Sequence, residues 1–453
     1  MTHEARRKGD RIWPVVVVGG GLAGLACAIR LAQRGVPVRL LETRQRPGGR
    51  ATSHVDPRGG LIDNCQHIAM GCCYRYLSLC EAMGVRDAFE WSDTQTWIEP
   101  GGRRSRIAIA PLPAPLHFGP SFARAAFLPL RAKASIARGM AAISTTSWRL
   151  WTGRTFAEFL DNAGQGQDER DLFWTPVIVS ACNLGIDRVD ASLALRVFRE
   201  GFLASRKAAR IGVPKVPLAN LYGAAEGIVA RAGGVLSLSK SVARIHGDRV
   251  ECGDGEVVRA RVVVVALPPE RCDALVDPDA RDERFACFEH LSHSPILGVH
   301  LWAERSILDT PHAVLVDDGL EHRVGVQWLF VKHGGQGPSA SAGTGQALHA
   351  VVSAADEWME LSEAQIAARV RADLNICLGA DAGDAVLRVV AIKERRATFA
   401  ATPEFERVRP TALGSGPLVL AGDYTSTGWP ATMEGAVRSG EAAAAGAIHR
   451  LAQ

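Results

Sequence analysis

Three glycines near the start of the chain have the spacing of a phosphate-binding turn. Gly19, Gly21 and Gly24 directly follow an apolar run at residues 15–18. In a turn between strand and helix, the first glycine permits the tight bend, the second lets the backbone approach a pyrophosphate, and the third lets helix and strand pack closely. The helix N-terminus then faces the phosphates. Glu42 ends the next apolar stretch, where an acid can accept hydrogen bonds from a ribose diol.

The elements around these glycines form a strand–helix–strand unit of about 30 residues, the size typical of nucleotide binding. Apolar spacing predicts a strand at 15–18, a helix at 22–34 and a strand at 36–42. Leu22 and Ala23 open the predicted helix and are expected among the cofactor contacts. A glycine motif alone can serve packing only, but this context favours a dinucleotide. The motif leaves NAD and FAD open.

Two further glycine-containing segments bear on that choice. Gly48, Gly49 and Arg50 come shortly after Glu42. A surface turn is the alternative reading of this segment, because Pro-Gly-Gly also encodes turns. At the other end of the chain, the apolar stretch "PLVLAGD" and a helix beginning near Met433 form a second strand-to-helix turn.

These segments resemble the amine oxidase and phytoene desaturase superfamily of FAD proteins. The resemblance implies an α/β fold, in which a Rossmann-like FAD-binding domain of the GR2 type is interleaved with a substrate domain of mixed sheet and helices. It also implies that the two glycine turns bind opposite ends of one FAD molecule. A helix N-terminus at the flavin stabilises the negative charge that forms there on reduction.

The resemblance carries over to individual residues. Gly48, Gly49 and Arg50 would continue the cradle beneath the pyrophosphate and flavin. Gly422 and Asp423 would bind the pyrophosphate–ribityl region. The remaining implied contacts are backbone groups of Val242 at the adenine and the start of the last helix, Thr432 and Met433, at the flavin.

The predicted FAD-binding domain is discontinuous and comprises residues 13–90, 212–270 and 410–453. Residues 91–211 and 271–409 form the predicted substrate domain. Two sequences within it have the pattern of helix capping boxes, starting at Thr155 and at Ser362. In the second predicted helix, Ile366, Val370, Leu374 and Cys377 share one face.

Four longer segments resemble one subfamily more closely, the hydroxysqualene dehydroxylases of bacterial squalene and hopanoid biosynthesis. They are "GGLIDNCQHIAMGCCYRYLSL", "FWTPVIVSACNLGIDRVDASLALRVFREGFL", "IGVPKVPLANLYG" and "GWPATMEGAVRSG". The implied reaction replaces the allylic hydroxyl of hydroxysqualene with a hydride from reduced FAD, giving squalene and water. Cys65 and the Trp429-Pro430 pair depart from the subfamily pattern and bear on the shape of the substrate site.

Loss of the hydroxyl as water needs a general acid. Asp63 and His67 lie in a segment that passes near the flavin in the superfamily. His67 is the better candidate, because an unperturbed imidazole titrates near neutrality. The alternative is structural, with Asp63 capping a turn and His67 satisfied in the core. Glu434 is interpreted as a first-turn helix acid rather than a catalytic group.

Three other functions are compatible with parts of the sequence pattern. A polyene desaturase would transfer hydride in the opposite direction, from a phytoene-type substrate to FAD. An amine oxidase is disfavoured, because Thr432 stands where those enzymes commonly place an aromatic residue of the amine cage. A non-catalytic isoprenoid-binding escort protein is disfavoured by the intact set of cofactor motifs. The sequence leaves the electron donor open.

Composition excludes other classes. The net charge of +4 is too small and scattered for a nucleic-acid binder, and no metal site is expected. Ten cysteines without paired spacing are interpreted as reduced, mostly buried thiols of a cytosolic protein. Only residues 1–14 precede the first predicted strand, and its apolar run at 15–18 is far shorter than a signal-peptide core, so no secretion is expected. No apolar run reaches the length that a membrane-spanning helix needs, so none is expected.

Residues 111–142 mix large apolar side chains with cations and suggest peripheral contact with the inner face of the cell membrane. An ordinary amphipathic helix covering the substrate domain is the alternative. The side chains concerned are Phe118, Phe122, Phe127, Leu128, Leu130, Arg124, Arg131, Lys133 and Arg138.

Overall fold

The structure is a computed structural model that describes residues 11–57, 60–317, 323–332 and 345–453. The expectation about the N-terminal leader lies largely outside the described residues. So do the parts of the predicted domain ranges at 58–59, 318–322 and 333–344.

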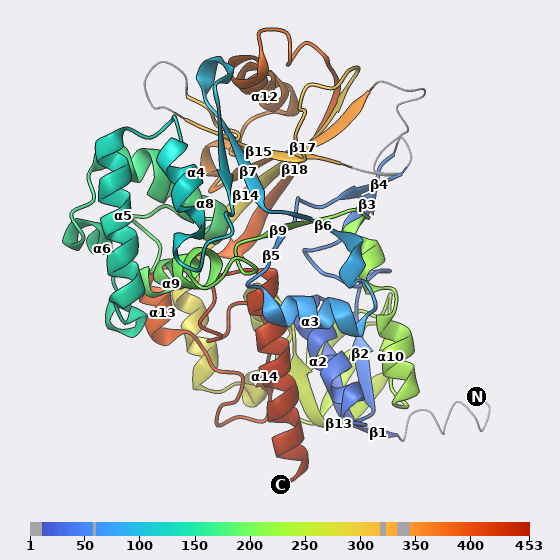
Figure 1. Cartoon of the computed structure of the whole chain (residues 1–453). Helices are drawn as coiled ribbons and strands as arrows, with labels where there is room; N and C mark the ends of the chain where they lie inside the picture. Colours follow the sequence, from blue (N-terminus) through green and yellow to red (C-terminus); the bar gives the residue numbers. More distant parts are fainter. Residues whose placement is uncertain (1–10, 58–59, 318–322, 333–344) are drawn as a thin grey trace.

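A seven-stranded, mostly parallel sheet carries both ends of the chain (Figure 1). Its order is β10, β2, β1, β13, β12, β11, and β19 pairs with β13 beside this path. The strand bounds are β1 Ile12–Val18, β2 Val38–Leu41, β10 Val235–Ser237, β11 Val242–Ile245, β12 Arg249–Cys252, β13 Val257–Val265 and β19 Val419–Leu420. The predicted strands at residues 15–18 and 36–42 and the apolar stretch "PLVLAGD" overlap β1, β2 and β19 of this sheet.

The centre of this sheet is apolar on both faces, as a parallel sheet covered on both sides requires. In parallel register, Val15 of β1 pairs with Val38 of β2 and Val262 of β13, and all three side chains are buried. Four helices share one apolar core with this sheet: α2 (Leu22–Gln33), α3 (Tyr74–Ala82), α10 (Ala225–Arg231) and α14 (Met433–Leu451). The predicted helices at 22–34 and from Met433 correspond to α2 and α14.

A second seven-stranded sheet lies beyond the first and is largely antiparallel (Figure 1). Its strands are β7 Thr94–Ile98, β8 Arg104–Ala108, β14 His293–Ala303, β15 His312–Leu315, β16 Trp328–Val331, β17 Gln346–Ser353 and β18 Val386–Phe399, in the order β18, β14, β17, β16, β15, β7, β8. Helix α12 (Glu363–Leu378) packs on one face of this sheet. The other face is turned toward the first sheet and the segments near Asp63.

Helix α12 begins at the predicted capping box. Ser362 accepts the Gln365 N–H, and the Gln365 side chain accepts the Ser362 N–H. The predicted apolar face is buried and packs on the sheet; its members are Ile366, Val370, Leu374 and Cys377. The capping box at Thr155 is also present and opens α6 (Phe156–Asn162).

Asp373 on α12 is a buried acid without a cationic partner among its hydrogen bonds. Its Oδ2 accepts the N–H groups of Gly325 and Val326 at 3.0 and 2.9 Å. Burial outweighs these two donors and raises the pKa of Asp373 to about 6. The folded protein therefore holds this proton more tightly than the unfolded chain, and stability falls as pH rises from about 4 to about 6.

Asp373→Asn is expected to stabilise the protein above neutral pH by about 2 kcal/mol, since the amide oxygen still accepts a hydrogen bond and no charge is buried. At about pH 4 the variant and the parent should be nearly equal, because the parent is then mostly protonated. Urea unfolding at both pH values measures the difference. A stability difference that does not change with pH would contradict this account.

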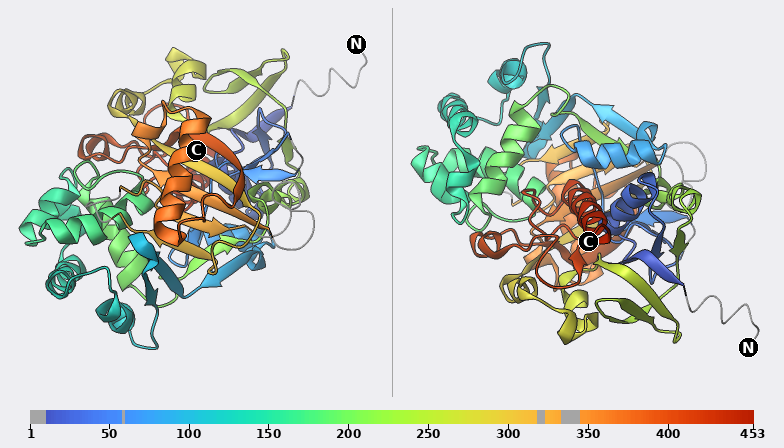
Figure 2. Two further views of the ribbon diagram at one scale, coloured as in Figure 1. Left: turned by 90° about the horizontal axis from the view of Figure 1, so that it is seen from above. Right: turned by 90° about the horizontal axis from the view of Figure 1, so that it is seen from below.

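A group of helices flanks the second sheet on one side in all three views (Figures 1 and 2). Their bounds are α4 Gly119–Arg124, α5 Leu130–Thr145, α6 Phe156–Asn162, α8 Thr175–Cys182 and α9 Ala191–Arg196; a π-helical segment, η6, continues α9 over Val197–Leu203. They share an apolar core rich in aromatic rings, including Trp174 and Phe198 with ring centroids 5.0 Å apart.

The predicted membrane-contacting segment 111–142 becomes part of this helical group. Phe127 and Leu128 are buried, with Phe127 stacked on Trp97 at 4.8 Å, so these two side chains cannot enter a lipid surface in this state. Leu116 and Leu130 remain exposed, as do Arg124, Arg131 and Arg138.

Two small sheets connect the large ones. One pairs β3 (Ser53–Val55) with β4 (Leu61–Asp63), and the other has the order β5 (Ala69–Met70), β9 (Ile211–Pro214), β6 (Phe89–Ser92). All ten cysteines are free thiols, and nine of them are buried, as predicted. No helix within the described ranges is long and apolar enough to cross a bilayer.

Candidate functional site

The first glycine turn, between β1 and α2, is closed by contacts that exclude any side chain. Gly19 has a φ of 107°, and a Cβ there would lie 2.3 Å from the carbonyl oxygen of Ala266. A Cβ on Gly24 would lie 1.9 Å from the carbonyl oxygen of Gly19. The sequence therefore needs glycine at both positions to bring helix and strand together.

Gly21 differs, because its missing side chain faces open space. A Cβ there would meet only the Cα of Gly49, at 3.8 Å. Its backbone is extended, with a φ of −69°, and it is partly exposed whereas Gly19 and Gly24 are buried. The space beside Gly21 lies at the N-terminus of α2, where the backbone N–H groups and the helix dipole favour an anion.

Glu42 lies at the end of β2 beside this turn. Its Oε2 accepts the Gly20 N–H at 2.6 Å and its Oε1 accepts the Arg44 N–H at 2.8 Å. The segment leading to Val242 runs alongside, because the Lys240 N–H donates to the Glu42 carbonyl at 2.8 Å. Val242 itself is partly buried at the start of β11. The structure thus brings the predicted ribose acid close to the segment predicted to contact adenine.

The second glycine pair stacks directly on the first turn. The Gly48 N–H donates to the Gly20 carbonyl at 2.8 Å, and Gly48 and Gly49 have φ values of 115° and 62°. A Cβ on Gly49 would lie 3.0 Å from the Cα of Gly21, and one on Gly48 would lie 2.6 Å from the Tyr222 ring. Both glycines therefore pack against the first glycine turn. A surface turn would not require such close contacts.

Arg50 connects the N-terminal and C-terminal segments. Its guanidinium binds Asp423 Oδ1 at 2.7 Å and donates to the Ala397 carbonyl at 2.7 Å. The ion pair with Asp423 outweighs burial and raises the pKa of Arg50 above its ordinary value. Arg409 fixes the loop that follows, because it donates to the carbonyls of Asp423 and Trp429 at 2.6 and 2.8 Å.

Helix α14 packs against α2 at backbone distance. A Cβ on Gly440 would lie 2.2 Å from the Ala23 carbonyl oxygen. Thr432 caps α14 by accepting the Gly435 N–H at 3.1 Å. Gly440 lies two turns into α14 but at the first turn of α2, so α14 begins nearer the second sheet, as Figure 1 shows. Two helix N-termini therefore lie along one path, suited to an elongated anionic ligand.

Glu434, in the first turn of α14, is fully buried and supports a neighbouring helix. Its carboxylate accepts the N–H groups of Arg75 and Tyr76, at the start of α3, at 3.0 and 2.9 Å. It also pairs with Arg438 at 2.7 Å. This carboxylate thus holds the N-terminus of α3, and burial, the largest influence on it, raises the pKa of Glu434.

Asp63 at the end of β4 forms a buried ion pair that the sequence did not indicate. Lys332 Nζ lies 3.0 Å from its Oδ2, while Ser53 and the Leu218 N–H donate to its Oδ1 at 2.8 and 2.9 Å. Burial alone would raise the pKa of Asp63, but the Lys332 ammonium and the two donors outweigh it and hold this pKa below the usual range. Asp63 therefore stays ionised and is unsuited to donate a proton.

His67 is partly exposed, and within the described ranges its imidazole ring makes one hydrogen bond. Its Nδ1 donates to the Cys65 carbonyl at 2.9 Å, which leaves Nε2 as the unprotonated nitrogen of the neutral ring. Burial is the main cause that lowers the pKa of His67, and the charges of Arg50 and Lys332 act in the same direction. A proton on Nε2 is therefore scarce at neutral pH.

Two further histidines approach this loop from the second sheet. His300 Nε2 donates to the Asp63 carbonyl at 2.9 Å, and the rings of His300 and His349 lie 4.1 Å apart. A Cβ on Gly298 would lie 2.7 Å from His349 Nε2 and 3.3 Å from Cys65 Sγ, so glycine at 298 makes room for this contact. Burial lowers the pKa of His300 to about 4 and also holds the pKa of His349 well below its usual value, so both rings are neutral.

Sequence reasoning missed Lys332, His300 and His349, because no local motif marks them. Lys332 and His300 reach Asp63, and His349 reaches His300, only through the pairing of β14, β16 and β17. Next to them lies an apolar cluster between the second sheet and β9, formed by Cys65, Ile211, Val213, Phe330 and Val351.

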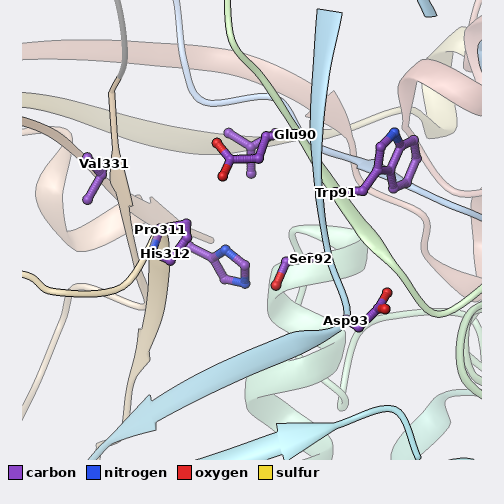
Figure 3. A pocket seen from close by; sticks show the side chains of 8 residues that line it. Glu90, Trp91, Ser92, Asp93, Pro311, His312 and Val331 are labelled. Carbon is purple, nitrogen blue, oxygen red and sulfur yellow. The ribbon is translucent and has the colours of Figure 1, made fainter. Parts of the chain in front are cut away.

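A small polar pocket of about 210 Å³ opens beside this cluster. Figure 3 shows Glu90, Ser92 and His312 directed into it, whereas Trp91 points away. Its other lining residues are Asp93, Val213, Pro311 and Val331. The mixed lining is too polar and the volume too small for a long hydrocarbon chain.

Comparison with known proteins identifies the family to which this chain belongs. A family model described as flavin containing amine oxidoreductase matches residues 22–448. The chain is 28% identical to the hydroxysqualene dehydroxylase of Rhodopseudomonas palustris over 95% of this chain and 97% of that protein. It is 27% identical to that of Sinorhizobium fredii over the same shares. It is also 25% identical to a phytoene desaturase of Narcissus pseudonarcissus, over 94% of this chain and 78% of that protein.

Solved structures show the same fold. Cyclohexylamine oxidase of Brevibacterium oxydans superposes with a TM-score of 0.71 at 19% identity, covering 98% of this chain and all of that one. Putrescine oxidase bound to putrescine gives a TM-score of 0.70 at 17% identity, covering 96% and 98%. The fold is α/β with a Rossmann-like FAD-binding domain, and the cofactor is FAD. The open space beside Gly21 and the two aligned helix N-termini fit such a dinucleotide.

Proposed function

The chain belongs to the flavin-containing amine oxidoreductase family and is an FAD-dependent oxidoreductase; from this premise we propose that it reduces hydroxysqualene to squalene in squalene or hopanoid biosynthesis. The observation that carries the proposal is near-full-length similarity to two hydroxysqualene dehydroxylases. The meeting of Arg50 with Asp423 supports it, since this contact joins the two cofactor segments at the site.

The proposed reaction exchanges an allylic hydroxyl for hydrogen. A proton and a hydride enter, and squalene and water leave, so atoms and charge balance. When bound and reduced, FAD supplies the hydride. The protein must hold the allylic carbon within about 3.5 Å of the hydride donor and exclude other water, which would recapture the cation.

The described residues provide an apolar wall for this purpose. Cys65, Ile211, Phe330 and Val351 are all less than a tenth exposed and form one cluster, which His67 reaches through its hydrogen bond to the Cys65 carbonyl. An isoprenoid chain lying against this cluster would displace water from the loop at residues 63–67. We therefore place the reacting hydroxyl between this loop and the start of α14.

We propose His67 as the residue that handles the leaving hydroxyl, with Asp63 as a structural support rather than an acid. The lowered pKa of His67 means that its protonated form grows as pH falls below neutrality. A rate that depends on protonated His67 Nε2 should therefore increase toward acidic pH.

A polyene desaturase is the second candidate, because phytoene desaturases also match nearly the whole chain. That reaction would transfer hydride from substrate to oxidised FAD and would require no leaving hydroxyl.

Single turnover separates these functions. We expect anaerobic, photoreduced enzyme mixed with hydroxysqualene to form one squalene per flavin while the flavin becomes oxidised, with products identified by mass spectrometry. The rate should increase as pH is lowered through the His67 titration and lose this dependence in His67→Gln. Flavin that remains reduced with hydroxysqualene, together with reduction of oxidised enzyme by phytoene, would exclude the dehydroxylase.

For location, we propose peripheral contact with the inner face of the cell membrane. The exposed side chains of Leu112, Leu116 and Leu130 support a contact within residues 111–142.

A further inference from the structure

If the proposed function holds, every turnover consumes one reduced flavin, and electrons must reach the site from outside. Within the described residues, one strand–helix–strand unit has the glycine spacing of a dinucleotide site, β1–α2–β2, and this is the unit that would hold FAD. The second sheet contains a single parallel pair, β7 with β15, and offers no such unit for a nicotinamide dinucleotide. We therefore consider a protein as the electron donor, and such a donor needs a docking surface on this chain.

Four arginines gather beside the C-terminal cofactor segment. Arg196, at the end of α9, lies over the Trp148 ring at 4.2 Å, and Arg149 lies over the same ring at 4.7 Å. Arg199, one turn further, donates to the Thr146 carbonyl at 2.9 Å. Arg438 of α14 lies over the Trp429 ring at 4.7 Å. We refer to Arg149, Arg196, Arg199 and Arg438 as the arginine cluster.

The positive charge of the arginine cluster is poorly compensated. Arg438 pairs with Glu434, but Arg149, Arg196 and Arg199 form no ion pair within the described part of the chain. The Arg196 Nε is buried without a hydrogen-bond partner there. Burial and then the neighbouring arginines lower the pKa of Arg196, and Glu200 offsets this only in part. Such an arrangement costs free energy unless an anion completes it.

The cluster adjoins the flavin end of the cofactor segments. A Cβ on Gly428 would lie 3.2 Å from Arg196 Nη2, and residues 428–433 lead directly into the N-terminus of α14. Trp429, which belongs to this segment, is 6% exposed, and Arg438 lies over its ring. A partner docked on the cluster would therefore contact the segment that the family uses to hold the flavin.

We propose that the arginine cluster is the docking surface for an acidic electron-carrier protein of the flavodoxin or ferredoxin class. Two carrier molecules each lose one electron, and the FAD gains both electrons with two protons from solvent. Planar guanidinium groups form paired hydrogen bonds with carboxylates, and a cationic patch steers an acidic protein to its site. Exposed Arg149 meets the partner first.

The test measures reduction of the oxidised holoenzyme by photoreduced flavodoxin in anaerobic stopped flow, without isoprenoid. We expect Arg149→Glu and Arg196→Gln each to lower the second-order rate at low salt by at least about 10-fold, and the parent's steep loss of rate with salt to flatten. The control is Arg34→Glu, at the C-terminal end of α2 and away from the cofactor turn, which should be reduced at the parent's rate. Light-driven reduction by a deazaflavin should be unchanged in all variants and verifies an intact flavin site.

Equal flavodoxin rates in parent and variants would overturn the docking surface. So would parent-like rates combined with lost binding to vesicles of anionic phospholipid, which would make the arginine cluster a membrane contact instead. Because the measurement contains no isoprenoid, its outcome is separate from squalene formation. Failure of the dehydroxylase proposal and failure of the docking proposal are therefore distinguishable.

Discussion

Gly21→Ala is expected to yield a folded protein that purifies without flavin. The backbone at Gly21 is in the extended region open to alanine, and an added Cβ would touch only the Gly49 Cα at 3.8 Å. The apoprotein should therefore keep its melting temperature to within about 2 °C. The same Cβ would occupy the space through which the backbone approaches the pyrophosphate. We expect FAD affinity to fall at least about 100-fold, or about 3 kcal/mol.

Two matched variants separate binding from folding. Gly119→Ala, at an open helical position with nothing within 4 Å, should retain full flavin content. Gly24→Ala should fail at the folding stage, because its Cβ would lie 1.9 Å from the Gly19 carbonyl oxygen. FAD titration of apoprotein, followed by flavin fluorescence, measures the affinity. If Gly21→Ala binds FAD as tightly as the parent, the pyrophosphate does not bind at this turn.

The contrast among these glycines shows what local sequence can predict. The turn, the helix after it and the strand at 15–18 follow from spacing alone, because glycine conformation and apolar periodicity are local properties. The capping boxes at Thr155 and Ser362 are predictable for the same reason. The C-terminal segment is recognisable because its glycines and helix start repeat that logic.

Contacts between distant segments are not local and were missed. Lys332 directly follows the short apolar strand β16, and no neighbouring residue in the sequence indicates that it pairs with an acid. It reaches Asp63 only because β16 pairs with β17 and β15 in one particular register. His300 and His349 meet for the same reason, since they are opposite residues of β14 and β17.

The burial of Phe127 and Leu128 also could not be predicted from the sequence. Phe127 and Leu128 have the composition of a lipid-facing segment, but a partner ring, Trp97 of β7, covers Phe127. An amphipathic pattern shows that a face must be buried, and it does not show whether protein or lipid buries it.

Lys332→Met is expected to destabilise the protein by about 3–5 kcal/mol at neutral pH, since it leaves the Asp63 carboxylate buried without its cation. The two side chains are 3% and 1% exposed, so solvent cannot replace the lost partner. Asp63→Asn should cost a similar amount by isolating the ammonium. The matched control is Arg395→Met, which breaks the exposed pair with Glu360 and should cost at most about 1 kcal/mol.

The pH dependence distinguishes a lost charge pair from a simple packing defect. In the parent, the lowered pKa of Asp63 contributes stability that is present above about pH 4, the unfolded value, and is lost as pH falls through the folded pKa. Without Lys332, burial raises the pKa of Asp63 instead, and the folded variant gains stability as the carboxyl becomes protonated. Urea unfolding across this range should therefore show the two proteins converging toward acidic pH. A difference in unfolding free energy that stays constant across this pH range would mean that Lys332 stabilises the protein through its methylene contacts. It would then not act by compensating the charge of Asp63.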